Sequence, residues 1–262
     1  MAQVTYTKEN DKWYADFDNR KKTLWKERWI NPIDMPEPTP SVTKGEIINI
    51  DMTGSGTPQQ YRVLKVNGSI AEVIAMTNAS DSQQFAASGQ TYENGVLDTY
   101  LNSTWYNTLS ATAKAAIVDK TIRQDSWYWG TQGNPDYQGK YSGDTAYQLS
   151  LGNASFGNEI TRHAYAISVQ DVLDYLEVTP QMTQADTTLT YDNVWTMFWN
   201  STTTHSGNMW LRSAFASDAS GAFIVYGSYG RLYSGYAGGS YAVRPALTID
   251  LSKIEWTPTI GE

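Results

Sequence analysis

Five tyrosines between positions 226 and 241 form the densest group of chemically useful side chains in this 262-residue sequence, and mainly Ser and Gly separate them. Tyrosine offers a large contact area with few rotatable bonds, while Ser and Gly adapt their shape and hydrogen bonding to a ligand. From Leu211 to Ser252 the chain also lacks Lys, Glu, Gln, Met, Trp and Asn, which all occur elsewhere in it. Ordinary solvated loops are rich in Lys, Glu and Asn, so this composition favours a binding surface. The alternative is a plain surface hairpin, because Tyr is a good strand residue and Gly and Ser are ordinary turn residues.

The sequence gives little support for a catalytic, metal-binding or nucleotide-binding site. His163 and His205 are the two histidines and there is no cysteine, which excludes a typical structural zinc site. No Gly-x-Ser-x-Gly motif, Walker loop or dinucleotide-binding loop is present, and the carboxylates are scattered, although a Ser–His–acid triad built from distant residues stays open. Asn134-Pro135-Asp136 is similar to a tripeptide of calcium-dependent sugar lectins, but the Trp-Asn-Asp partner segment of those sites is missing. We therefore predict no catalytic residue, no metal ligand and no cofactor, and a protein that is not an enzyme.

Two arginines flank the tyrosine segment in apolar surroundings. Arg212 follows Met209-Trp210-Leu211, and Arg244 precedes Pro245-Ala246-Leu247. Because guanidinium groups form several fixed hydrogen bonds, we interpret both as framework residues paired with acids such as Asp250 or with backbone carbonyls, not as ligand contacts.

Composition and charge restrict the class of protein further. A hydrophobic fraction of 40% supports a sizeable core, while the formal net charge of -8 argues against a partner held by phosphate contacts, so we predict no nucleic acid. No run approaches the roughly 18 apolar residues that a membrane span requires. The first residues show no charged-then-apolar pattern, so we expect synthesis in the cytoplasm without a signal peptide.

The composition changes near residue 45, which suggests two parts. Residues 1–31 are aromatic and densely charged, and four prolines between positions 32 and 40 indicate a stiff, extended spacer. We predict an N-terminal anchoring arm with a Pro-rich linker over residues 1–44 and a ligand-binding domain over residues 45–262. The arm is too small to bury a core of its own, so it either docks on another protein or packs back on its own domain.

Within the larger part, hydrophobic patterns predict strands and helices. Three apolar segments predict neighbouring antiparallel strands: 46–50, 60–66 and 70–76. Asn67-Gly68 is a strong hairpin turn, and Ser110 and Ser168 are suited to cap helices that begin directly after them. Residues 78–94 read as a Ser/Gln/Gly-rich loop, and residues 121–157 as a long aromatic loop whose role the sequence does not define.

Five motifs occur in an order that resembles a known domain family. They are Gly45-Glu46-Ile47 with Tyr61-Arg62-Val63-Leu64, Leu97-Asp98-Thr99-Tyr100-Leu101-Asn102 with Trp105-Tyr106-Asn107, Ala166-Ile167-Ser168-Val169-Gln170-Asp171, Trp210-Leu211-Arg212-Ser213, and Val243-Arg244-Pro245-Ala246-Leu247. Over residues 45–251 the sequence resembles a family of bacterial and phage domains with the C-type lectin fold, whose last strand region carries this VRPAL motif. Members of that fold include the variable proteins of diversity-generating retroelements, such as phage tropism determinants.

The resemblance implies a fold and a set of site residues. The expected fold class is α+β: a C-type lectin fold with small twisted antiparallel sheets and two or three helices, preceded by the N-terminal arm. In such variable proteins, mutagenesis at the adenines of Asn codons yields Tyr, Ser, Gly, Asp, Arg, Ala and Phe but never Lys, Glu, Gln, Met or Trp, and residues 214–242 obey this rule. The ligand-binding positions expected on this basis are Tyr226, Ser228, Tyr229, Arg231, Tyr233, Ser234, Tyr236, Gly239, Ser240 and Tyr241.

The resemblance also implies a function. We expect a receptor-binding protein or adhesin of a phage, associated with the virion, that binds a protein or glycan on a host surface through a diversified tyrosine-rich face. Arg231 would be the strong charged anchor of that face. The arm would attach to a virion component or to sister subunits, with a homotrimer expected by analogy. Two other classes stay open: a bacterial surface or cell-wall-binding module with a fixed ligand, and a structural component of a virion.

Overall fold

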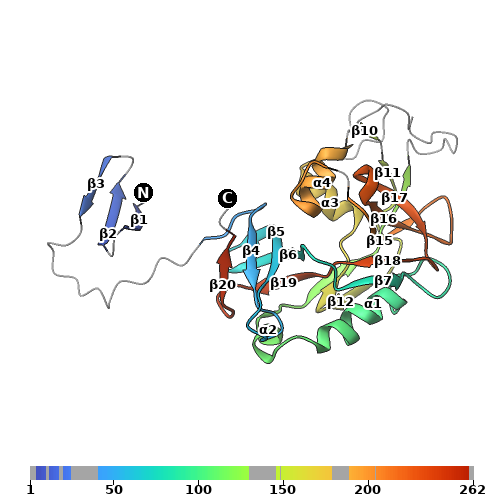
Figure 1. The fold of residues 1–262 in the computed structure, drawn as a ribbon. Helices are drawn as coiled ribbons and strands as arrows, with labels where there is room; N and C mark the ends of the chain where they lie inside the picture. Colours follow the sequence, from blue (N-terminus) through green and yellow to red (C-terminus); the bar gives the residue numbers. More distant parts are fainter. Residues whose placement is uncertain are drawn as a thin grey trace. The chain divides into compact units, whose positions relative to one another are not determined.

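The computed structural model describes residues 4–9, 12–17, 20–24, 41–129, 146–147, 149–178, 189–203 and 205–259. Its contacts divide the chain into two compact units, Met1–Ser41 and Val42–Glu262 (Figure 1). The strands of the first unit form one antiparallel sheet in the order β1-β2-β3: β1 Val4–Glu9, β2 Lys12–Phe17 and β3 Arg20–Leu24. The predicted proline-rich spacer at 32–40 lies outside the described residues.

A six-stranded antiparallel sheet forms one half of the second unit. Its order is β13-β19-β6-β5-β4-β20. The strands are β4 Ile47–Ile50, β5 Gln59–Asn67, β6 Ile70–Ala75, β13 Ala164–Tyr165, β19 Ala246–Asp250 and β20 Trp256–Pro258. The predicted hairpin at Asn67-Gly68 is confirmed, because Asn67 pairs with Ile70 and Gly68 adopts a φ of 62° that glycine accommodates without a steric penalty. All five residues of β19 are buried, and the strand lies between the short β13 and β6.

A seven-stranded sheet forms the other half and contains the tyrosine segment. Its strands are β7 Ser80–Gln84, β9 Ser126–Trp129, β11 Leu149–Asn153, β15 Asn208–Phe215, β16 Gly221–Tyr226, β17 Arg231–Tyr236 and β18 Ser240–Val243. The path β11-β9-β15-β16-β17 is continuous, while β18 pairs with both β15 and β7. Two shorter ladders join β8 Lys120–Arg123 to β12 Glu159–Arg162, and β10 Ala146–Tyr147 to β14 Leu189–Thr190.

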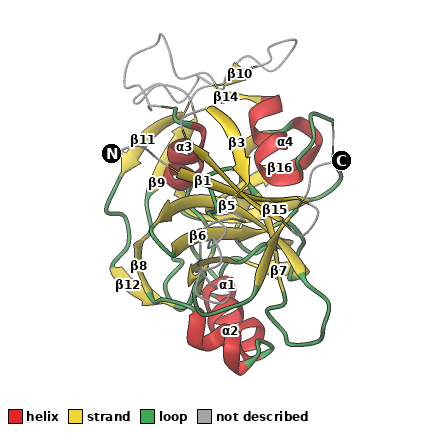
Figure 2. Ribbon diagram, turned by 90° about the vertical axis from the view of Figure 1, so that its left-hand side faces the viewer, coloured by secondary structure: helices red, strands yellow, loops and turns green. Residues whose placement is uncertain are grey.

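The helices lie at two opposite ends of this unit (Figures 1 and 2). One end holds α1 Val96–Thr99, a π-helix Tyr100–Trp105 and α2 Ala111–Ala116, and the other holds α3 Val169–Leu176 and α4 Tyr191–Trp199. Both predicted caps are confirmed. Ser110 accepts a hydrogen bond from the backbone N–H of Ala113, and Ser168 forms a reciprocal capping box with Asp171.

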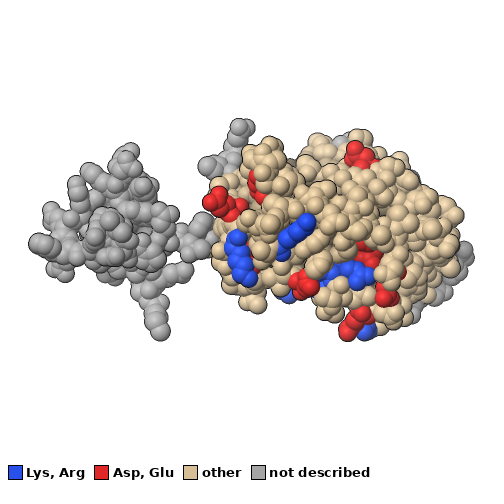
Figure 3. All heavy atoms as spheres, turned by 90° about the horizontal axis from the view of Figure 1, so that it is seen from below, with Lys and Arg blue, Asp and Glu red and all other residues tan. Residues whose placement is uncertain are grey.

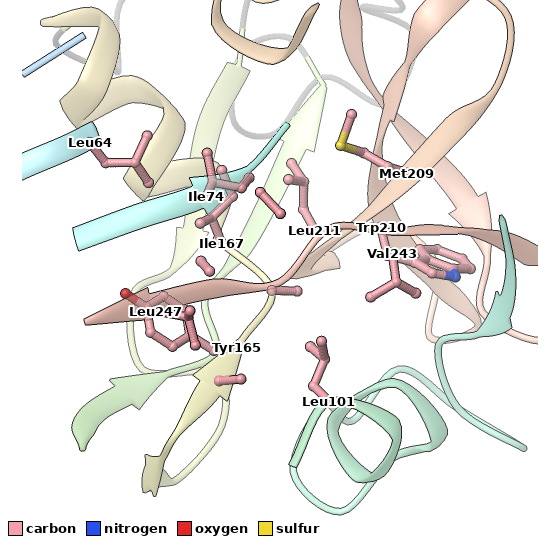
Figure 4. Close-up of a cluster of buried hydrophobic side chains, with 14 of the residues drawn as sticks. Leu64, Ile74, Leu101, Tyr165, Ile167, Met209, Trp210, Leu211, Val243 and Leu247 are labelled. Atoms are coloured by element: carbon pink, nitrogen blue, oxygen red, sulfur yellow. The ribbon is translucent and has the colours of Figure 1, made fainter. Parts of the chain in front are cut away.

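The hydrophobic core connects the two large sheets. Figure 4 shows side chains of both sheets converging with Leu101 of the π-helix. Val243 ends β18 and Ala246 begins β19, so the VRPAL motif carries the chain from one sheet to the other. Pro245 has no N–H to donate to a strand ladder, but its carbonyl accepts a hydrogen bond of 3.0 Å from the N–H of Ala75. The motif is therefore a crossing point that ties the sheets together.

The predicted fold class is wrong. Strands make up 41% of the structure and helices 20%, and the six- and seven-stranded sheets are unlike the small sheets of a C-type lectin fold. Both segments predicted as loops contribute strands: residues 78–94 contain β7, and residues 121–157 contain β9, β10, β11 and part of β8. The five residues of β7, Ser-Asp-Ser-Gln-Gln, have no apolar alternation, so their strand conformation depends on pairing with β18.

Asp250, the last residue of β19, makes the stability of this sheet sensitive to acid. Hydrogen bonds from the side chains of Ser252 and Ser69 lower the pKa of Asp250 from 3.8 to about 2. A carboxylate with a lowered pKa stabilises the folded state above its unfolded pKa and loses that effect as the pH falls through the folded value. We expect the unfolding free energy of the native chain to fall from about pH 4 to about pH 2, and that of Asp250→Asn to fall less. Chemical denaturation at several pH values measures the difference, and parallel curves would contradict it.

Candidate ligand-binding site

The tyrosine segment folds into two long strands, a short turn and part of a third strand. β16 and β17 are antiparallel, with Tyr226 opposite Arg231 and Ile224 opposite Tyr233, and a 3-10 turn over Gly227–Tyr229 joins them. Gly230 ends the turn with a φ of 57°, a left-handed conformation that favours glycine and lets the chain reverse into β17. All ten predicted ligand-binding residues remain accessible to solvent. Four are exposed, namely Ser228, Tyr229, Tyr236 and Ser240, and the other six are half-buried.

Three of the tyrosines surround Arg231. The guanidinium carbon lies 4.6 Å from the ring centre of Tyr229, 5.0 Å from that of Tyr233 and 5.6 Å from that of Tyr226. The rings also contact one another, because Tyr226 stacks on Tyr229 at 5.1 Å and meets Tyr233 at 5.9 Å. A cation within about 6 Å of an aromatic ring centre is attracted by the ring. Arg231, predicted as the charged anchor for a ligand, therefore also holds this cluster together.

Tyr241 extends the cluster along the same face of the sheet. Residues two apart on a strand share a face, so Arg231, Tyr233 and Gly235 lie on the same face of β17. A Cβ on Gly235 would lie only 2.8 Å from the ring of Tyr241, so the missing side chain leaves the space that this ring fills. Tyr241 also makes an edge-to-face contact of 4.7 Å with the buried ring of Trp210. We call Tyr226, Tyr229, Arg231, Tyr233 and Tyr241 the tyrosine row.

Tyr236 and Ser234 alternate to the opposite side of β17, so the structure does not place them in the tyrosine row. The ring of Tyr236 is 68% exposed and lies against Gly238, where a Cβ would come within 2.7 Å of it. The next residue, Gly239, donates its N–H to the Tyr236 carbonyl, and a Cβ there would lie 2.9 Å from that oxygen. The absence of side chains at Gly235 and Gly238 therefore leaves room for the rings of Tyr241 and Tyr236.

A second layer of aromatic side chains supports the turn that carries Tyr229. The indole N–H of Trp195 donates to the carbonyl of Gly227 at 2.6 Å, and the ring of Trp199 stacks on His205 at 4.9 Å. A Cβ on Gly227 would lie 2.3 Å from the carbonyl oxygen of Gly207 and 2.8 Å from that of His205. Two backbone carbonyls thus leave no room for a side chain at this position.

We expect Gly227→Ala to destabilise the protein and to displace the turn. Overpacking of this kind costs about 1–3 kcal/mol because the surrounding backbone must move. Thermal unfolding measures the loss, and Ser228→Ala at the exposed neighbouring position is the control. Equal melting temperatures for the two variants would show that the turn accommodates the added methyl group without a loss of stability.

Sequence reasoning missed the contribution of β7 to this site. Tyr241 pairs with Gln83, and Ser240 pairs with Gln84, so β7 lies directly beside the end of the tyrosine row. Trp210 donates its indole N–H to the carbonyl of Gln83 at 2.7 Å, which fixes the position of β7. A buried Trp N–H needs a hydrogen-bond acceptor, so Trp210 was a signal in the sequence that another segment lies beside it. The sequence does not identify the residue that provides this acceptor.

The interpretation of Arg212 and Arg244 as framework residues is confirmed, with one change of partner. Arg212 donates to the carboxylate of Asp171 at 2.5 Å and to two backbone carbonyls. Arg244 donates to the carbonyl of Phe198 and to the side chain of Asn78, and burial lowers its pKa to about 10. Asp250, named as a candidate partner from the sequence, bonds Ser252 and Lys253 instead.

A polar cleft beside α3 is the second candidate for a site. Its volume is about 510 Å³, and it is lined by Lys44, Leu64, Lys65, Glu72, Lys120, Asp171, Asp174 and Tyr175. Its best-placed charges are already paired, because Lys120 bonds Glu72 at 2.6 Å and Asp171 bonds Arg212. Although burial opposes it, the nearby Arg212 charge keeps the pKa of Asp171 below its ordinary value, so this carboxylate is a poor proton donor. This arrangement favours a structural role for the cleft.

The buried pair Ser213 and Asp125 is equally unsuited to nucleophilic catalysis. Ser213 donates to Asp125 but is fully buried, and the Trp127 indole N–H also binds this carboxylate at 2.8 Å. Across the described ranges, no group of three or more His, Cys, Asp or Glu side chains is placed to hold a metal ion. The tripeptide at 134–136 lies outside those ranges.

The helices that the structure describes are all too short or too polar to cross a membrane.

In comparisons with known proteins, residues 67–251 match a family described as a domain of unknown function, DUF6273. No curated protein and no solved structure matches the chain. The matched region begins at the end of β5, contains every strand of the seven-stranded sheet and ends just after β19. Because this match spans most of the sequence, the chain belongs to the DUF6273 family.

Proposed function

We propose that this protein is a receptor-binding protein or adhesin, whose task is attachment and not catalysis. The observation that carries the proposal is the exposure of aromatic rings that neighbouring residues hold in place: Tyr229 is 51% exposed although it stacks on Tyr226 and Arg231. Rigid, accessible tyrosines are typical anchors of binding surfaces, because little conformational entropy is lost when they are covered.

Binding of the labelled full chain to a panel of intact bacterial strains tests this proposal. We expect saturable binding to at least one strain, which unlabelled protein displaces. Binding that rises linearly with concentration on every strain would overturn the attachment function. A host-adsorption assay with purified phage particles, together with mass spectrometry of those particles, tests the proposal that the protein is carried on a virion.

We also propose that the tyrosine positions are diversified between copies of the gene, as in retroelement variable proteins. The constraint at Gly239, one of the ten expected positions, favours the second candidate, a module with a fixed ligand, because a side chain there would clash with the backbone oxygen of Tyr236. Sequencing the locus across a population separates the two. Variation at Tyr229, Tyr233 and their neighbours supports diversification, and an invariant segment supports the fixed module.

The first unit would then serve as the attachment point to a virion component or to sister subunits. The homotrimer also remains a prediction, made by analogy with the family that the sequence resembles. Light scattering of the full chain and of residues 42–262 tests both, with a loss of the oligomer on truncation as the expected result.

A further inference from the structure

We propose that the ligand of the tyrosine row is a neutral, extended polysaccharide. This inference rests on the proposed attachment function and identifies the chemical class of the ligand. The ring faces would pack against the C–H faces of successive sugar units, and polar groups of β7 would bind sugar hydroxyls at the end of the row.

The dimensions of the row favour an extended polymer. Arg231 and Gly235 are four residues apart on β17, so the row spans roughly 13 Å from the turn to the position where the Tyr241 ring lies. Tyr226 contacts both Tyr229 and Tyr233, and the ring of Tyr241 lies against Gly235, two residues beyond Tyr233 on β17. A small molecule would cover one ring, while a chain of sugars can contact several.

The shape of the row favours sugars over a protein partner. Protein interfaces are typically anchored by side chains that enter pockets of the partner. In the tyrosine row only Tyr229 is exposed, whereas Tyr226, Tyr233 and Tyr241 are half-buried and offer part of their surface without projecting. Such a surface suits the flat C–H face of a sugar ring.

The charge around the row favours a neutral ligand. Between Asp218 and Arg244 the sequence contains one charged residue, Arg231, and its guanidinium group lies against three tyrosine rings. Figure 3 shows that Lys, Arg, Asp and Glu side chains are scattered over the displayed face of the second unit, with uncharged residues between them. Without a cluster of cations, the row has little to attract an acidic polymer.

Gln83 provides hydrogen-bonding capacity at the end of the row. Its side-chain nitrogen donates to Ser80 at 3.3 Å, while its side-chain oxygen accepts no hydrogen bond within the part of the chain that the structure describes. Because Gln83 pairs with Tyr241, this amide lies beside the last ring of the row. A sugar hydroxyl that packs beyond Tyr241 would find an acceptor there.

The first test treats cells of a strain that the protein binds. Periodate cleaves the vicinal diols of sugars, and a protease removes surface proteins. We expect periodate to abolish binding and protease to leave it within about twofold. Loss with protease and retention after periodate would overturn the sugar ligand while leaving the attachment function intact, so the two proposals fail separately.

The second test titrates soluble polysaccharides against the full chain. Pullulan, mannan and dextran are the neutral probes, alginate and heparin the acidic ones, and tryptophan fluorescence reports binding because Tyr241 contacts the Trp210 ring. We expect saturable binding of at least one neutral polymer. Binding confined to the acidic polymers, or to none of the five, would overturn the proposal.

Matched variants at Tyr233 locate the binding on the row. Tyr233→Phe retains the ring and should keep the affinity for the neutral polymer within about threefold, whereas Tyr233→Ser should lower it at least tenfold. Thermal unfolding and the circular dichroism spectrum of both variants establish that they are folded. Equal affinities for the two variants would place the ligand elsewhere.

Discussion

Tyr229→Ser is expected to weaken binding to cells by at least about 30-fold, because an interface anchor contributes roughly 2 kcal/mol or more. The ring is half-exposed and contacts Tyr226 and Arg231 at the surface, so its removal uncovers no part of the hydrophobic core. The melting temperature should therefore stay within about 2 °C of that of the native chain. Titration of labelled protein on cells and differential scanning calorimetry measure the two quantities.

Tyr236→Ser is the matched control. This tyrosine is even more exposed, at 68%, but it alternates to the other side of β17. We expect its loss to change the affinity by less than about threefold, since substitutions outside an interface are close to neutral. The reverse pattern, with loss of binding at Tyr236 and retention at Tyr229, would transfer the site to the opposite side of the strand.

Arg212→Met should destabilise the protein by about 3–5 kcal/mol, the range observed when one partner of a buried ion pair is removed. The side chains of Arg212 and Asp171 are 7% and 22% exposed, and the variant leaves the Asp171 carboxylate without its cation. Two backbone carbonyls also lose their donor. Unfolding in guanidinium chloride at pH 7, followed by tryptophan fluorescence, measures the change.

The double variant Arg212→Met/Asp171→Asn tests this explanation. Removing the orphaned charge should restore about half of the lost stability or more, because the cost arises mainly from an uncompensated carboxylate. A destabilisation by Arg212→Met of less than about 1 kcal/mol would contradict the role of Arg212 as a framework residue. Additive effects of the two substitutions would show that the pair does not act as a unit.

Local elements were predictable where a residue acts on its immediate neighbours. Ser110 and Ser168 accept backbone hydrogen bonds three residues ahead, and Asn67-Gly68 forms a tight hairpin, so short sequences contained the full signal. The framework role of Arg212 and Arg244 followed from their apolar surroundings. The acid that pairs with Arg212 was not predictable, because Asp171 is 41 residues away in the sequence.

The fold class was not predictable because strand pairing depends on distant partners. β15 pairs with β16, the next strand in the chain, but also with β18 and with β9, which ends at Trp129, far earlier in the sequence. β7 has no hydrophobic alternation and is a strand because β18 provides its hydrogen-bonding partners. A resemblance carried by short motifs therefore led to an incorrect architecture.

The sequence by itself determined the composition of the binding segment, its flanking framework residues and the local starts of its helices and turns, because these depend on residue types and short spacings. Only the tertiary structure decided which tyrosines share a face, which glycines make room for their rings, and that β7 lies beside them. The alternation of β17 separates Tyr233 from Tyr236, and the pairing of β18 brings Gln83 to Tyr241. These relations are set by contacts between segments far apart in the chain, which no local pattern contains.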